Sequence, residues 1–280
     1  MSGSCPCHHG ELLQGAFRGT DGVLRPGLVT LPYPGRRVHA RFEPGPGPSI
    51  TVGPGHRPKA ARAAALTRAR LADGVGGRVV LSGGVAPGLG MGSSTADVVA
   101  TIRAVACGHG VQLAAAEIAR IAVAAEAASD PLMFDDVRVR LFAPRDGHVL
   151  ETLADALPPL RVVGSVLGGP VDTPATAPPL RHERAYAILL ARLRAALDRG
   201  DAAGVARVAT ASARLNRSDL GPLLRAAERA GALGVQVAHS GNVAGLLLDP
   251  ADDPGAAAAA LRAEGLPVTG AFLVGDLVPA

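Results

Sequence analysis

The chain has 280 residues, of which 48% are hydrophobic, 19% charged and 2% aromatic, with three cysteines and a formal net charge of +4. This length and hydrophobic content suit one large domain or two small ones, and they exclude a disordered chain. The low aromatic content and the scattered basic residues argue against nucleic-acid binding. Because the sequence shows no long apolar run and no leader pattern, we expect neither a membrane span nor secretion. Three cysteines are too few for a disulfide framework, so we expect a cytoplasmic enzyme or ligand-binding protein.

Short strands and turns are expected over the first 55 residues, where glycine and proline interrupt the apolar pattern. The expected strands are 28–32, 37–43, 49–52, 77–82, 137–141, 148–153, 234–238, 243–248 and 267–274. The expected helices begin at Pro58 and run to residue 72, then cover 94–107, 114–128, 182–198, 201–215, 219–231 and 254–264. Because these elements mix without a regular βαβ alternation, the sequence favours an α+β fold.

One glycine-rich segment lies between an expected strand and an expected helix, which is where backbone N–H groups are free to bind an anion. The segment lacks the Gly-Lys-Ser/Thr of a Walker A loop and the third glycine of a Rossmann fingerprint, and a simple turn with serine caps is the alternative. We expect a phosphate cradle made of Pro87, Gly88, Leu89, Gly90, Met91, Gly92, Ser93, Ser94 and Thr95.

Three segments together resemble the signature motifs of the galactokinase–homoserine kinase–mevalonate kinase (GHMP) superfamily. Residues 87–96 resemble its phosphate-binding motif, CPCHHGELLQG at 5–15 its N-terminal substrate motif, and 231–245 its C-terminal motif. Four shorter matches are most similar to the L-threonine kinase branch, which serves cobalamin biosynthesis: GELLQG at 10–15, SSTAD at 93–97, VDT at 171–173 and AHSG at 238–241.

The resemblance implies a two-lobed GHMP kinase fold, with a ribosomal-S5-like nucleotide-binding lobe over 1–155 and a ferredoxin-like lobe over 156–280. It also implies phosphorylation of L-threonine by ATP and Mg²⁺, with Ser94 and Glu126 holding the metal and Asp130 orienting or deprotonating the acceptor hydroxyl. The implied partner is a small hydroxylated molecule, and a homodimer is left open. Besides Asp130, the residues expected to bind the acceptor are His8, His9, Glu11, Gln14, Ser240 and Gly241.

Two regions depart from the family pattern. Relatives have a glutamate three residues before the aspartate that corresponds to Asp130, and this chain has Ala127 at that position. Glu126 lies one residue earlier. A shift of one residue along a helix turns the side chain by about 100°. His8 and His9 replace a small or hydroxyl residue and a cysteine. Together with Cys5 and Cys7 they superficially suggest a soft-metal site, but no second ligand pair follows, so we expect them to line the acceptor pocket.

Several alternatives stay open at this point. The chain could be a kinase for another hydroxylated amino acid or small alcohol in specialised metabolism. It could also be a catalytically silent paralogue that binds nucleotide and ligand, which would be favoured if Glu126 cannot reach the metal. Lys59 and Arg62 lie on a helix that could approach the nucleotide, although a solvated helix face is the simpler interpretation. His239-Ser240 lacks the nucleophile elbow of a hydrolase.

Overall fold

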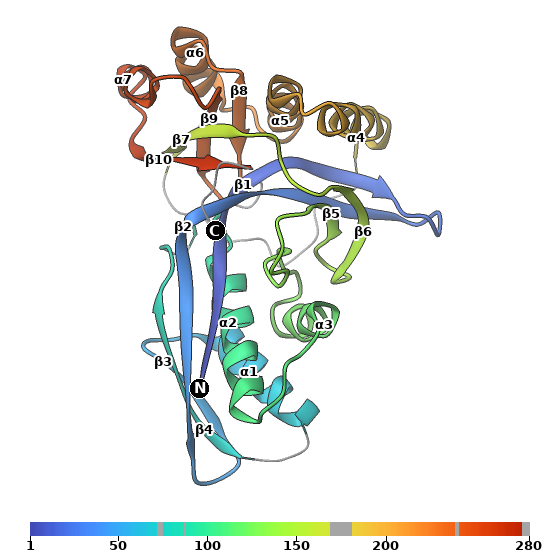
Figure 1. Cartoon of the computed structure of the whole chain (residues 1–280), viewed down its shortest axis with the longest axis vertical. Coiled ribbons are helices and arrows are strands. Elements are labelled where there is room, and N and C mark those ends of the chain that lie inside the picture. Colours follow the sequence, from blue (N-terminus) through green and yellow to red (C-terminus); the bar gives the residue numbers. More distant parts are fainter. Residues whose placement is uncertain (72–74, 87, 169–180, 239–240, 276–280) are drawn as a thin grey trace.

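The computed structural model describes residues 1–71, 75–86, 88–168, 181–238 and 241–275, and Figure 1 shows their arrangement. The strands are β1 (Ser2–Arg18), β2 (Leu24–Gly45), β3 (Ile50–Gly53), β4 (Gly76–Gly83), β5 (Val139–Ala143), β6 (His148–Ala154), β7 (Leu160–Val166), β8 (Gly234–Val237), β9 (Val243–Leu248) and β10 (Val268–Val274). The helices are α1 (Pro58–Leu71), α2 (Ser93–Gly108), α3 (Ala115–Glu126), α4 (Glu183–Asp198), α5 (Ala202–Asn216), α6 (Gly221–Ala230) and α7 (Pro254–Ala263).

The α+β expectation is confirmed, but three strands differ from it. Residues 2–18 form the long strand β1 rather than short strands and turns, because register shifts after Pro6 and His8 absorb the breakers while β1 stays paired with β2. The separately expected strands 28–32 and 37–43 are parts of the one strand β2. Strand β7 was not expected at all, although it lies inside the sheet between β9 and β10. Its short apolar sequence lacks the alternation of polar and apolar residues that marks a half-buried strand, because most of its residues are buried.

The sheet places the N-terminal motif at the centre of the molecule. Its strand order is β10-β7-β9-β8-β1-β2-β4-β3, with β5 pairing β2 and β6. Figure 1 shows β1 and β2 as long bent strands that run from the lower half, with α1 to α3, into the upper half, with α4 to α7. Glu11 of β1 pairs with Val237 of β8. Because β1 and β2 serve both halves, the division into lobes at residue 155 stays a prediction.

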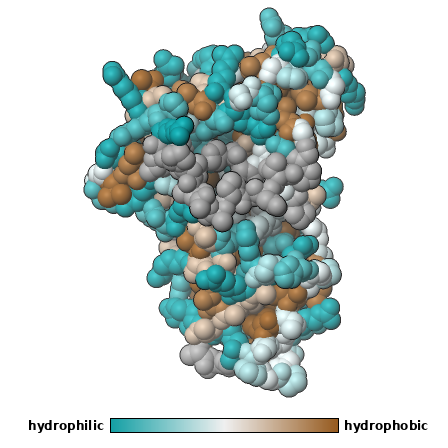
Figure 2. All heavy atoms as spheres, turned by 180° about the vertical axis from the view of Figure 1, so that it is seen from behind, coloured by the Kyte–Doolittle hydropathy of each residue, from teal (hydrophilic) through white to brown (hydrophobic). Residues whose placement is uncertain are grey.

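Helix α2 is held rigidly in the core of the lower half. Its residues Val98, Val99, Ile102 and Val105 are fully buried, and they pack in one apolar cluster with residues of α1, α3, β2 and β4. The N-terminus of α2 therefore has a fixed position facing the centre of the molecule. No helix among the described residues is long and apolar enough to span a membrane, and Figure 2 shows hydrophilic and hydrophobic residues interspersed on the face it displays.

Candidate active site

The glycine-rich segment forms a tight loop that leads into α2. Gly90 and Gly92 both have positive φ, 78° and 67°, a backbone conformation that favours glycine. Gly92 is the N-cap residue, so the first backbone N–H groups of α2 lack partners within the helix. A helix N-terminus of this kind favours anions, and Ser93, Ser94 and Thr95 lie in its first turn. The phosphate cradle at this junction stays a prediction. Pro87 lies outside the described residues.

The C-terminal motif packs directly on this loop. The backbone N–H groups of Asn242 and Val243 donate to the carbonyl of Leu89 at 3.1 and 2.7 Å. A Cβ atom on Gly241 would lie 2.3 Å from the Cα atom of Gly90, so only glycine allows this approach. The structure thus places Gly241 against the phosphate loop, while Ser240 lies outside the described residues.

Glu126 reaches the phosphate loop despite its shifted position in the sequence. The Ser94 hydroxyl donates to Glu126 Oε2 at 2.9 Å, and the Thr95 hydroxyl donates to Oε1 at 2.9 Å. Helix α3 ends at Glu126 instead of continuing to residue 128 as expected, because Ala127 adopts a left-handed conformation with φ of 68°. The chain therefore leaves the helix directly after Glu126 and turns toward Asp130.

Glu126 is a buried carboxylate with little positive charge around it. Its side chain is only 2% exposed, and among the described residues its one basic ion-pair partner is Lys59, at 3.9 Å. Burial and the nearby Asp130 raise the pKa of Glu126 to about 7, against hydrogen bonds from Thr95 and Ser94. A carboxylate and a hydroxyl beside an anion-binding helix terminus fit Mg²⁺, which prefers oxygen ligands and keeps waters and phosphates in its shell.

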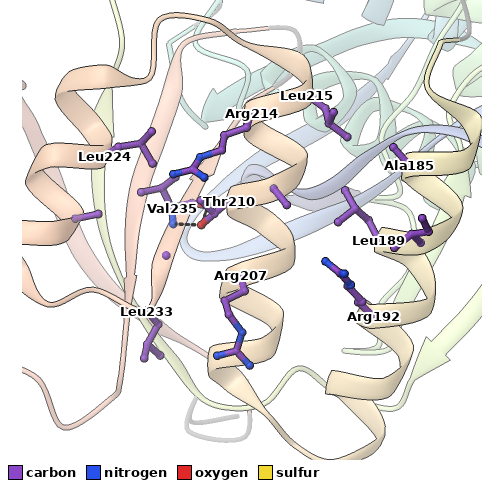
Figure 3. Close-up of a pocket in the computed structure, with 14 residues that line it drawn as sticks. Ala185, Leu189, Arg192, Arg207, Thr210, Arg214, Leu215, Leu224, Leu233 and Val235 are labelled. Atoms are coloured by element: carbon purple, nitrogen blue, oxygen red, sulfur yellow. Dashed lines mark hydrogen bonds between the residues drawn. The ribbon is translucent and has the colours of Figure 1, made fainter.

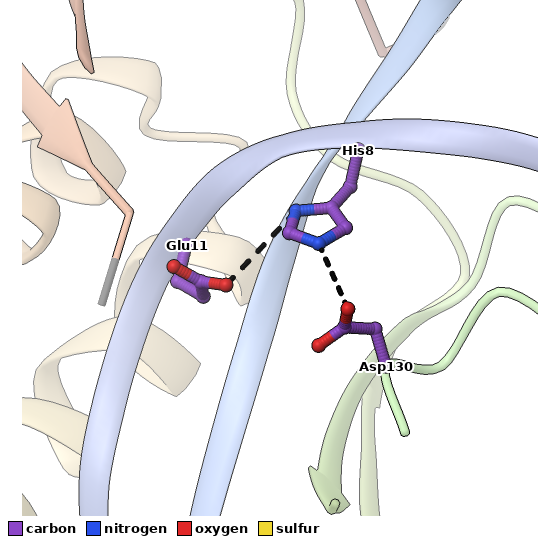
Figure 4. Close-up of side chains that lie close together, drawn as sticks. All are labelled: His8, Glu11 and Asp130. Atoms are coloured by element: carbon purple, nitrogen blue, oxygen red, sulfur yellow. Dashed lines mark hydrogen bonds and ion pairs between the residues drawn. The ribbon is translucent and has the colours of Figure 1, made fainter. Parts of the chain in front are cut away.

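Asp130 follows α3 and meets His8 of β1 (Figure 4). His8 Nε2 lies 3.2 Å from Asp130 Oδ2, and Nδ1 lies 3.2 Å from the Gly10 carbonyl and 4.0 Å from Glu11 Oε1. Burial lowers the pKa of His8, but Asp130 and Glu11 outweigh it and raise that pKa to about 9. His8 is therefore an imidazolium whose two ring N–H groups are occupied, which makes it unsuitable as a metal ligand.

Thr95 connects the two carboxylates. Its hydroxyl lies 3.4 Å from Asp130 Oδ2 as well as 2.9 Å from Glu126 Oε1, and the backbone N–H of Asp130 donates to it at 3.3 Å. Burial raises the pKa of Asp130, but the His8 imidazolium and the Thr95 hydroxyl outweigh it and bring that pKa below its usual value. Ser94, Glu126 and Asp130 thus belong to one hydrogen-bonded cluster at the start of α2.

The comparisons with known proteins agree with this geometry. Residues 59–140, which contain the phosphate loop, Glu126 and Asp130, match the family model of the GHMP kinases N terminal domain. These residues therefore form a domain of the GHMP kinase N-terminal type. The enzyme class that this domain indicates is a phosphotransferase with an alcohol group as acceptor.

Solved kinases of this superfamily share the fold of almost the whole chain. Homoserine kinase from Cytophaga hutchinsonii is 16% identical with a TM-score of 0.65, covering 98% of this chain and 94% of its own. Mevalonate kinase from L. major, solved with R-mevalonate, is 18% identical with a TM-score of 0.66 and the same coverage. Streptococcus pneumoniae phosphomevalonate kinase, solved with phosphomevalonate and AMPPNP, is 11% identical with a TM-score of 0.68, covering 98% and 99%. A search of curated protein sequences finds no match.

Two of the residues expected to bind the acceptor, His9 and Gln14, have their contacts elsewhere than at the carboxylates of Glu126 and Asp130. His9 Nδ1 lies 2.6 Å from Gln236 Nε2, and its ring packs against Tyr33 and Phe272. Gln14 lies six residues beyond His8, about 20 Å along an extended strand. Its backbone N–H donates to the Ser212 hydroxyl. Of the expected acceptor residues within the described parts of the chain, His8 and Glu11 are those that gather with Asp130.

The structure gives two residues that the sequence analysis considered a more specific place in the site. Lys59, expected on a helix that could approach the nucleotide, lies beside Glu126. Thr95, expected in the phosphate cradle, contacts both carboxylates. Cys5 and Cys7 are buried, and Cys5 Sγ donates to the Leu132 carbonyl at 3.4 Å.

The kinase has a cavity of about 530 Å³ on the Asp130 side of the site, lined by His8, Tyr33, Arg37, Pro131 and Arg138 among others. A second cavity of about 530 Å³ lies on the upper half between α4, α5, α6 and β8. Figure 3 shows the leucines that line it, Leu189, Leu215, Leu224 and Leu233, and the arginines Arg192, Arg207 and Arg214. None of the residues that line this second cavity belongs to the Glu126–Asp130 cluster.

Proposed function

We propose that this kinase transfers the γ-phosphoryl group of Mg-ATP to the side-chain hydroxyl of L-threonine, giving O-phospho-L-threonine and ADP. The observation that carries the proposal is the single cluster in which Thr95 joins Glu126 to Asp130 at the start of α2. Phosphoryl transfer needs a phosphate cradle, a metal site and a group beside the acceptor hydroxyl, and this cluster offers all three within hydrogen-bond distances.

Ser94 and Glu126 hold the magnesium ion of the nucleotide, and the first N–H groups of α2 bind the phosphate oxygens. Bound there, Mg²⁺ supplies charge neutralisation for the transferred group. The weakly compensated charge of the buried Glu126 supports this assignment, because its cationic neighbour Lys59 is 3.9 Å away and burying a carboxylate without a close cation is costly.

Asp130 orients the acceptor hydroxyl and receives its proton. As the hydroxyl oxygen bonds to the γ-phosphorus, the bond from phosphorus to ADP breaks and the hydroxyl proton passes to Asp130. The low pKa of Asp130 makes it a weak base, so orientation is its larger contribution; a loose phosphoryl-transfer transition state demands little proton removal early on. His8 keeps this carboxylate ionised and fixed in direction.

Two charged features support an amino acid as acceptor. Glu11 is buried beside His8 and carries the charge that suits an α-ammonium group. Arg37 and Arg138 line the adjoining cavity and suit an α-carboxylate. The choice of threonine among hydroxylated amino acids rests on the motif resemblance at 10–15, 93–97, 171–173 and 238–241.

The test is product formation from Mg-ATP with single acceptors: L-threonine, L-serine, L-homoserine, D-threonine and L-allo-threonine, read by mass spectrometry. We expect selective phosphorylation of L-threonine that falls at least 100-fold in Glu126→Gln and Asp130→Asn. Glu117→Gln is the matched control, because Glu117 lies on the same helix but pairs with Arg70 instead. A different preferred acceptor would overturn threonine and keep the kinase. ATP binding without any product would favour the silent paralogue, which the contact between Glu126 and Ser94 argues against.

A further inference from the structure

Lys59 is an exception in a chain that otherwise uses arginine. The chain has 28 basic side chains, and Lys59 is the only lysine among them. It is the second residue of α1, which packs against α2 and α3. Its Nζ atom lies 3.9 Å from Glu126 Oε2, and its side chain is 48% exposed where that of Glu126 is 2% exposed. The ammonium group therefore lies at the solvent side of the metal-binding carboxylate.

The contact between Lys59 and Glu126 is looser than the neighbouring ion pairs. Arg57 lies two residues before Lys59, and its Nε atom is 3.2 Å from Asp97 Oδ2. Arg140 is 2.6 Å from Asp136. At 3.9 Å, Lys59 lies beyond the usual hydrogen-bond distance of about 2.7–3.2 Å. Among the described residues it has no hydrogen-bond partner, so its three N–H donors remain available for another anion.

The position of Lys59 points to the phosphates as that anion. The Ser94 hydroxyl and the Lys59 ammonium approach the same oxygen, Glu126 Oε2, at 2.9 and 3.9 Å, so these two groups lie at most 6.8 Å apart. A phosphoryl group bound at the N-terminus of α2 lies within reach of a flexible lysine side chain from there. Lys59, the one ion-pair cation beside Glu126 in the part of the chain that the structure describes, thus lies near the expected position of the terminal phosphates.

We propose that Lys59 binds the terminal phosphate oxygens of the bound nucleotide, which deepens the proposed function and rests on it. Without nucleotide, its ammonium balances part of the charge of Glu126; with nucleotide, it turns its donors to the γ-phosphoryl group and helps to orient it. Lysine suits this double task because it is a compact charge on a flexible stem. An arginine there would form a closed, bidentate pair with Glu126 and compete with the metal.

The single lysine allows a direct test by amine acetylation. The purified protein is acetylated under limiting reagent, with and without Mg-AMPPNP or AMP, and the modified peptides are quantified by mass spectrometry. The α-amino group of the exposed Met1 is the internal reference. We expect Mg-AMPPNP to slow modification of Lys59 at least 10-fold relative to Met1, and AMP, which lacks the terminal phosphates, to slow it less than 2-fold.

Binding of the same nucleotides to variants provides the second arm. Lys59→Met should raise the Kd for Mg-AMPPNP at least 10-fold with little change for AMP, and Lys59→Arg should not restore binding. Arg62→Met, an exposed position on the same helix, is the control and should bind as the unmodified protein does. If Mg-AMPPNP binds tightly but does not protect Lys59, and if the Kd is unchanged in Lys59→Met, this inference is overturned and the proposed function is not. Absence of Mg-AMPPNP binding to the unmodified protein would overturn the proposed function and this inference together.

Discussion

His8 Nε2 lies 3.2 Å from Asp130 Oδ2, although 122 positions separate the two residues in the chain. The pair joins the N-terminal motif to the segment after α3, and the backbone N–H of His8 also donates to the Met91 carbonyl of the phosphate loop at 3.2 Å. Three segments far apart in the sequence therefore meet at His8, and the charge of its ring sets the state of the proposed acceptor-binding carboxylate.

Replacing His8 by glutamine removes that charge while keeping a polar side chain of similar size. The pKa of Asp130 lies below its usual value because of His8, so it should rise in His8→Gln, and the acid limb of kcat/KM against pH should move to higher pH. We expect kcat to fall by roughly 10- to 100-fold. His39→Gln, at an exposed position on β2, is the control. An acid limb that stays in place would show that His8 has no electrostatic effect on the reaction.

Gly241→Ala should weaken nucleotide binding through the phosphate loop. The added methyl group would lie 2.3 Å from both the N and the Cα atom of Gly90, so the loop must move. We expect the Kd for Mg-ATP to rise at least 10-fold, measured by calorimetry, with a smaller effect on thermal stability. Gly45→Ala is the matched control, since its methyl group would meet only an ordinary contact at 3.5 Å. Equal Kd values for the two variants would contradict the tight approach.

Ala127→Gly should stabilise the protein. Ala127 has φ of 68°, and an L-residue in this conformation costs about 1–2 kcal/mol, part of which glycine returns as entropy of the unfolded chain. A net gain of about 1 kcal/mol corresponds to a rise in Tm of about 2–4 °C. Ala128→Gly, the adjacent position without positive φ, should lower or not change Tm. Scanning calorimetry of the two variants separates these outcomes.

His9 should make the protein sensitive to acid. Burial and the neighbouring His8 lower the pKa of His9 to about 3, below its value near 6.5 in the unfolded chain. The unfolded state therefore binds more protons below pH 6.5, and this contribution to stability, complete above that pH, is lost as the pH falls toward 3. Linkage gives a loss of about 2 kcal/mol between pH 7.5 and pH 5.

His9→Gln should lose less stability than the unmodified protein over the same pH interval, as measured by urea unfolding at both pH values. His8 acts in the opposite direction, because its raised pKa stabilises the fold below pH 6.5 and this stability is lost as the pH rises through 9. That contribution is present in both proteins and cancels in the comparison. An identical pH dependence for the two proteins would show that His9 is not buried in its neutral form.

Local patterns were sufficient for most of the helices and for the phosphate loop. Pro58 marked the start of α1, and the alternating glycines before Ser93 marked the loop and the start of α2, because both follow from allowed backbone angles of a few residues. Strands were harder to predict, as β1 and β7 show. In β1, glycine and proline interrupt the pattern and register shifts absorb them. Strand β7 pairs with β9 and β10, which lie about 80 to 110 residues further along the chain.

The sequence pattern indicated an anion-binding helix start at α2, and the resemblance to the GHMP kinases nominated Ser94, Glu126 and Asp130 beside it. Only the tertiary structure decided that Glu126 meets Ser94, that His8 rather than His9 meets Asp130, and that Lys59 lies beside the cluster. Register shifts such as those of β1 decide which face of the sheet a side chain occupies. Packing between distant segments selects these local conformations, so spacing in the sequence cannot reveal them.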